Sequence, residues 1–162
     1  MIDGSSVIPE CHADTLLIRL LGFERPTHKE GIGGVANVMK KDYKNRIAVG
    51  VVDDDNKIPT YFKSFEVEKR GNHFIFRYLP QQKHYLLVVT PAFESCIFNI
   101  AEEIKISPEK YGFKSAKQFR NAAKDKNVHK NQNVKQFLNT LIQKKDSPLK
   151  EVKTWITQKL NP

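Results

Sequence analysis

The chain has 162 residues, a net charge of +9 and two cysteines. This length fits one domain that buries a core without disulfide bonds. Cys11 and Cys96 show no metal-binding or redox spacing, so we expect reduced thiols in a cytoplasmic protein. The longest apolar runs fall far short of the about 20 residues that span a membrane, and the N-terminus lacks the pattern of an export signal.

The excess positive charge is confined to the C-terminal third of the chain. Residues 1–104 hold 13 Lys and Arg against 14 Asp and Glu, whereas residues 105–162 hold 14 against 4. Segregated positive charge is typical of a surface that binds a polyanion such as nucleic acid. A lysine-rich helical surface that only keeps the protein soluble has the same composition, so both interpretations stay open.

The N-terminal part predicts alternating strands and helices. The expected strands cover residues 5–9, 25–29 and 47–52, and the expected helices cover residues 14–22 and 35–41. Asp14 is expected to cap the first helix and Gly22 to stop it. The order strand, helix, strand, helix, strand implies right-handed crossovers and a doubly wound, mainly parallel α/β sheet.

The rest of the chain predicts an edge hairpin, one more strand and a helical tail. The hairpin lies within residues 63–78, and a further buried strand covers residues 84–90. Pro91 is expected to open a helix that runs to about residue 104. Amphipathic helices are expected within residues 115–124, 131–144 and 147–160. We therefore expect an α/β core over residues 1–104, with a basic helical region over residues 105–162 packed on it as a single domain.

The most informative junction is the point where the apolar run 47–52 meets Asp53, Asp54 and Asp55. In an extended segment Asp53 and Asp55 point to the same side, about 7 Å apart, and Asp54 points to the other. Ligands gather at the carboxyl ends of parallel strands, where Glu10 ends the first expected strand. A glutamate and two aspartates there would suit Mg²⁺ or Mn²⁺ and metal-assisted phosphodiester chemistry.

An acidic triplet after a strand is also typical of a turn or of a cap for the next helix. An EF-hand is excluded, because Lys57 occupies the third ligand position and Ile58 the position that requires glycine. Asp14 also fits a helix cap, and His12 is interpreted as an incidental loop histidine. The glycine pair 33–34 is weak evidence for a phosphate site, because such pairs commonly just let the chain turn.

The acidic segments resemble the motifs of Toprim domains, in the expected order and spacing. Glu10-Cys11-His12-Ala13-Asp14 resembles the first motif, in which a glutamate ends the first strand and an acid follows four residues later. Gly33-Gly34 is similar to the small glycine motif, and Asp53-Asp54-Asp55 resembles the Asp-x-Asp motif. Pro91-Ala92-Phe93-Glu94, ahead of a helical tail, is similar to a segment of the overcoming-lysogenization-defect (OLD) nucleases and related phage-defence proteins. The chain departs from the pattern at Cys11, where glycine is usual, and at Pro9 within the first strand.

The resemblance implies a Toprim-like fold and a nuclease or nicking domain that uses Mg²⁺ or Mn²⁺ and acts on nucleic acid, DNA in preference to RNA. Carried over by motif, Glu10 is the proton-transferring or metal-binding residue, and Asp53 and Asp55 are the metal ligands. Further site candidates are Asp14, Glu94 and Lys57, and the candidates for contact with the phosphate backbone are Gly33, Gly34, Lys117, Arg120 and Lys124. Glu94 fits equally well the favourable start of a helix.

A second hypothesis comes from a different class of protein. The chain has no Walker A motif, so any ATP-driven step would need a partner. In this interpretation the protein is a catalytically weak Toprim-like subunit that binds nucleic acid or works with a separate ABC-type ATPase.

Overall fold

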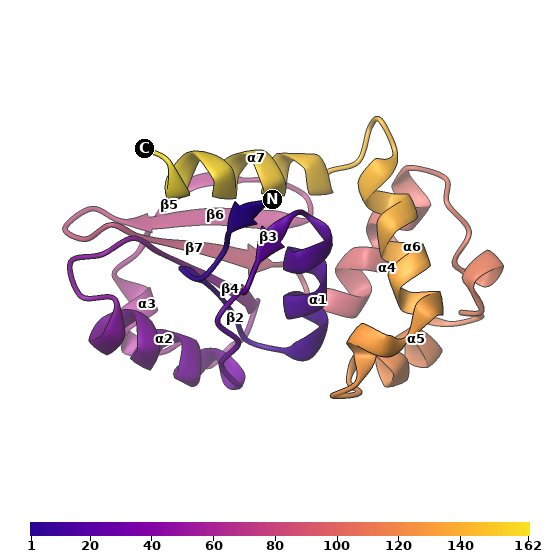
Figure 1. Ribbon diagram of the computed structural model, residues 1–162, viewed down its shortest axis with the longest axis horizontal. Coiled ribbons are helices and arrows are strands. Elements are labelled where there is room, and N and C mark those ends of the chain that lie inside the picture. The colour runs from indigo at the N-terminus through magenta and orange to yellow at the C-terminus, as the bar shows by residue number, and fades with distance from the viewer.

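A mixed five-stranded sheet crosses the computed structural model, which describes residues 1–162 (Figure 1). Its strands, in spatial order, are β2 (Val7–Pro9), β4 (Ala48–Asp53), β7 (His84–Val89), β6 (Phe74–Leu79) and β5 (Glu66–Arg70). β2, β4 and β7 are parallel, whereas β6 and β5 form the expected antiparallel hairpin at the edge. The fold is α/β as predicted, but the sheet is mixed because the hairpin supplies two of its five strands.

The prediction of a second sheet strand at residues 25–29 is wrong. The chain instead forms β3 (Phe23–Glu24), which pairs with β1 (Ile2–Asp3) in a separate two-stranded sheet. Thr27 and Lys29 still donate their backbone N–H groups to the carbonyls of β2, at 2.9 and 3.0 Å. The segment therefore follows the free edge of β2 without becoming a regular strand, and it carries His28 toward the end of that strand.

Seven α-helices surround the sheet (Figure 1). They are α1 (His12–Leu20), α2 (Gly31–Asp42), α3 (Thr60–Lys63), α4 (Phe93–Glu103), α5 (Ala116–Ala123), α6 (Gln132–Gln143) and α7 (Leu149–Leu160), with 3₁₀ turns η1 (Pro108–Tyr111) and η2 (Val128–Lys130). Successive side chains of a strand face opposite sides. Accordingly Val49 and Val51 enter a core shared with α1, α4, α6 and α7, whereas Ala48 and Val52 enter a smaller core under α2 and α3.

The three predicted C-terminal helices are present as α5, α6 and α7. In Figure 1, α5 and α6 gather with α4 beyond one end of the sheet, whereas α7 returns alongside the strands. Trp155 of α7 packs on Phe76 of β6, with ring centroids 5.0 Å apart. None of the helices combines the length and the apolar character that a membrane-spanning segment requires.

Three helix starts differ from the prediction. α1 begins two residues early, because the N-cap is Cys11, whose Sγ accepts the N–H of Asp14 at 3.3 Å. Asp14 is therefore not the cap but a buried residue of the first turn. α2 begins at Gly31, which adopts a φ of 75° that favours glycine. Pro91 lies outside α4, which begins at Phe93.

Candidate metal centre

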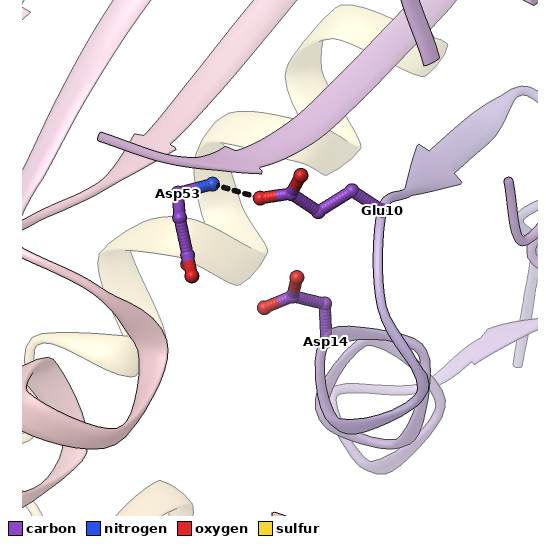
Figure 2. A group of neighbouring side chains, drawn as sticks. All are labelled: Glu10, Asp14 and Asp53. Atoms are coloured by element: carbon purple, nitrogen blue, oxygen red, sulfur yellow. Dashed lines mark hydrogen bonds between the residues drawn. The ribbon is translucent and has the colours of Figure 1, made fainter. Parts of the chain in front are cut away.

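Three carboxylates meet at the carboxyl ends of β2 and β4 (Figure 2). Pro9 pairs with Val51 in the parallel ladder, so the next residue, Glu10, lies beside the end of β4. Asp53 is the last residue of β4, and Asp14 belongs to the first turn of α1. One oxygen of each carboxylate lies within 4.8 Å of the other two.

Backbone donors fix two of these carboxylates. Glu10 Oε1 accepts the N–H of Asp53, which joins the two strand ends directly (Figure 2). Asp53 Oδ1 accepts the N–H of Phe93 at 3.0 Å, and Phe93 is the first residue of α4. The positive end of the α4 dipole therefore faces a carboxylate. The site depends on β2, β4 and α4 meeting at one edge.

A thiol positions the third carboxylate. The Sγ of Cys11 donates to Asp14 Oδ2 at 2.9 Å and caps α1 at the same time. Because α1 begins directly after β2, its first turn lies against the strand ends. Cys11 thus orients Asp14 toward the other two acids.

Three carboxylates so close together are unfavourable in free energy when all of them are charged and no cation lies among them. Burial, together with the charge of Asp53, raises the pKa of Asp14 well above its ordinary value. Burial and the charges of Glu10 and Glu94 raise the pKa of Asp53 to about 7. Burial also raises the pKa of Glu10, against the opposing effect of the Asp53 N–H. A cation among the three carboxylates would relieve both the burial cost and their repulsion.

One oxygen of the cluster is left without a partner. Asp14 is fully buried, and its Oδ1 makes no hydrogen bond. Figure 2 shows the Asp14 carboxylate directed toward Glu10 and Asp53. Buried carboxylate oxygens are normally satisfied, and hard divalent cations bind through several such oxygens. The three residues could therefore hold a metal ion.

The cluster contains Asp14 where the sequence analysis named Asp55. The alternation argument does not apply to Asp55, because β4 ends at Asp53 and Asp55 lies beyond the regular strand. Asp55 is exposed, and its Oδ1 accepts the N–H of Lys57 at 2.9 Å. Asp55 remains near the site, since its charge contributes to the raised pKa of Glu10.

A cavity of about 390 Å³ opens over the cluster. Its lining residues are Glu10, Cys11, His12, Ala13, His28, Glu30, Gly31, Asp53, Asp55, Phe93, Glu94, Ala123 and Lys124. Of the additional candidates, Glu94 and Lys124 thus lie at the site. The other candidates, Lys57, Gly33, Gly34, Lys117 and Arg120, do not line this cavity. A Cβ at Gly33 would meet no atom within 4 Å, so the fold does not require glycine at that position.

Sequence reasoning missed His28. Its ring packs against His12, with centroids 4.4 Å apart at an angle of 32°. The two rings meet because the chain after Pro26 follows the edge of β2. A local sequence pattern does not predict this long-range pairing, so His28 was missed. His12, interpreted above as incidental, lies on the wall of the cavity.

Compared with known proteins, the chain matches no family model, no curated protein and no solved structure.

Proposed function

We propose that this protein is a divalent-metal-dependent nuclease or nicking enzyme, built on a Toprim-like doubly wound core and acting on the phosphodiester bonds of nucleic acid, DNA in preference to RNA. One observation carries the proposal. The buried carboxylate of Asp14, which has one unpartnered oxygen, faces two further carboxylates at the carboxyl ends of adjacent parallel strands. The resemblance of these acidic segments to Toprim motifs, including those of phage-defence nucleases of the OLD class, supports the same conclusion.

The donor set favours Mg²⁺ or Mn²⁺, because all the ligand atoms of the cluster are carboxylate oxygens. Such an ion supplies positive charge to the attacking and leaving oxygens of a phosphodiester. Asp14 and Asp53 would hold the ion. Glu10 is only partly buried and uses Oε1 for the Asp53 N–H, which leaves Oε2 to accept a proton from the attacking water.

The charge distribution supports a polyanionic substrate. Lys124 lies in the wall of the cavity, at the end of α5. Lys117 and Arg120 are exposed on the same helix and would contact the nucleic acid farther from the cluster. The carboxylates would otherwise repel phosphate, so cations at the rim favour binding.

The test is nicking of supercoiled plasmid in Mg²⁺ or Mn²⁺, with EDTA as the metal-free control. We expect Glu10→Ala and Asp53→Ala each to lower the rate by at least about 100-fold, as for loss of an acid–base or metal-binding group. Asp54→Ala is the matched control, because Asp54 is exposed and lies outside the cluster. Full activity in both cluster variants would refute the proposal.

Binding without cleavage would have a different meaning. A wild-type protein that binds DNA with a steep salt dependence but does not nick it would favour the alternative, a binding subunit that works with an ABC-type ATPase.

A further inference from the structure

A second cavity adjoins the metal centre on the outer side of α1. Its volume is about 260 Å³, and its lining residues are His12, Thr15, Leu16, Arg19, His28, Lys126, Val128 and His129. It shares His12 and His28 with the cavity over the carboxylates. The tilted pair of histidines therefore lies at the boundary between the two cavities.

The two cavities have opposite charge. The lining of the first includes Glu10, Asp53 and Glu94, whereas no Asp or Glu lines the second. Arg19 and Lys126 are exposed in the second cavity, and neither forms an ion pair. Cationic groups in a concave surface without acids concentrate positive potential. Arginine in addition offers paired N–H donors that match phosphate oxygens.

The second cavity is built by α1, by the segment that carries His28 and by residues 126–129, which are distant in sequence from the other two. His12, Leu16 and Arg19 recur at helical spacing on one face of α1. The turn η2 packs against α1 through the buried Val128, which presents Lys126 and His129 beside that face. The fold therefore fixes the backbone positions from which these side chains extend.

The histidine boundary also has an unused polar atom. The Nε2 of His28 is buried and makes no hydrogen bond within the protein. A buried polar atom without a partner is uncommon, and this one lies in a residue that lines both cavities.

We propose that the cavity formed by Arg19, Lys126 and His129 binds a second phosphate of the nucleic-acid strand whose scissile phosphate lies at the carboxylate cluster, with the strand crossing over His12 and His28. This inference rests on the proposed function for the identity of the strand. It specifies the substrate further, since a polynucleotide with a phosphate beside the cleaved one fills both cavities. A phosphodiester with a single phosphate fills only the first.

The test compares two double variants that lose the same charge. Arg19→Ala/Lys126→Ala removes the two cations of the second cavity. Lys41→Ala/Lys44→Ala removes two exposed lysines near the end of α2, which line neither of the two cavities. All four side chains are exposed, so both proteins should keep the wild-type melting temperature, which is checked first.

Binding is measured by fluorescence anisotropy with a short single-stranded DNA oligonucleotide in EDTA, over a series of salt concentrations. We expect Arg19→Ala/Lys126→Ala to weaken binding at least about fivefold and to reduce the slope of log K against log salt by about 0.7, the value for one lost phosphate contact on a single strand. Lys41→Ala/Lys44→Ala should bind like the wild type. Equal losses in the two variants, or no binding by the wild type, would overturn the inference.

Kinetics separate this inference from the proposed function. With Mg²⁺ or Mn²⁺, Arg19→Ala/Lys126→Ala should raise KM for an oligonucleotide but leave hydrolysis of bis(4-nitrophenyl) phosphate, which has one phosphate, unchanged. If no variant and no wild-type protein cleaves either substrate while the binding difference persists, the nuclease proposal fails and the phosphate site stands. If the wild type cleaves and the two double variants behave alike, the phosphate site fails and the nuclease proposal stands.

Discussion

Ionisable groups are buried at both ends of the strand pair β4 and β7. At the amino end the buried group has hydrogen-bond partners for all its polar atoms, whereas at the carboxyl end one polar atom has none. At the amino end, His84 pairs in register with Ala48 and is only 1% exposed. Its Nδ1 bonds to the hydroxyl of Tyr61, and its Nε2 donates to the carbonyl of Tyr43 at 2.9 Å. At the carboxyl end, beyond Asp53, the buried Asp14 keeps one oxygen without a partner.

The difference separates a polar network that the protein completes from a carboxylate cluster that it leaves open. A buried polar network that is complete within the protein adds stability and rigidity. Three carboxylates that share a buried site repel one another when they are ionised, and a proton or a bound cation relieves that repulsion. The amino end of the sheet, at His84, is therefore complete within the protein. The carboxyl end, at the carboxylate cluster of Glu10, Asp14 and Asp53, is incomplete.

The largest expected effect is at the complete end. His84→Ala would leave the Tyr43 carbonyl and the Tyr61 hydroxyl without their partner and would open a cavity, at a cost of about 3 kcal/mol in the free energy of unfolding. Urea denaturation measures this loss. The variant should retain the response to divalent cations, because the carboxylate cluster is untouched. A loss below about 1 kcal/mol would show that the network is not structurally important.

The next largest effect is expected at the incomplete end, where a divalent cation should bind to the carboxylate cluster and stabilise the protein. Mg²⁺ or Mn²⁺ at about 100 times its dissociation constant should stabilise the wild-type protein by about 2.7 kcal/mol. For a chain of this size that corresponds to a rise in Tm of about 5–10 °C, measured by calorimetry. Asp53→Asn should abolish the rise. The same rise in Asp53→Asn as in the wild type would place the ion elsewhere.

The two ends should also respond to pH with opposite sign. Asp53 has its pKa raised from 3.8 to about 7, so in the metal-free protein its contribution to stability is full below pH 3.8 and is lost as the pH rises to about 7. Burial lowers the pKa of His84 below 6.5, so its contribution is full above pH 6.5 and is lost as the pH falls.

Urea denaturation of the metal-free wild type and of Asp53→Asn between pH 4 and 7 isolates the carboxylate contribution. The wild type should lose stability relative to Asp53→Asn as the pH rises, by about 2 kcal/mol after allowance for solvent screening. A difference that stays constant across this range would contradict the raised pKa of Asp53.

The meeting of Glu10 and Asp53 at the carboxyl end of the sheet was predictable from sequence, whereas the His84 network at the amino end was not. The apolar run before Asp53 predicted a buried strand in parallel pairing, and the short apolar segment before Glu10 predicted a second one beside it. Strand order and the position of acids at strand ends then predicted that Glu10 and Asp53 would meet. These inferences succeeded because alternation and burial are local properties of a strand.

The other residues of the site could not be predicted in this way, because their positions depend on where α1 begins and where β4 ends. Asp14 joined the cluster because Cys11 starts α1 at once after the strand, whereas Asp55 left it because β4 stops two residues earlier. Element boundaries are set by tertiary contacts and caps that a sequence pattern predicts poorly. The cationic cavity around Arg19 was beyond reach for the same reason, since it needs η2 and the edge of β2 to meet α1.

The smallest expected effect tests directly the position at which β4 ends. Asp55→Asn should weaken the cation-induced stabilisation by less than about 0.7 kcal/mol, roughly a threefold change in affinity, because Asp55 is exposed and acts only through its charge. Asp14→Asn should remove most of the stabilisation, because Asp14 contributes the unpartnered oxygen. Titration of Mn²⁺ into each protein, followed by calorimetry, measures both. If Asp55→Asn lost the ion and Asp14→Asn kept it, alternation along an extended strand would describe the site better than the end of β4 does, and the incomplete end of the sheet would need a different third ligand.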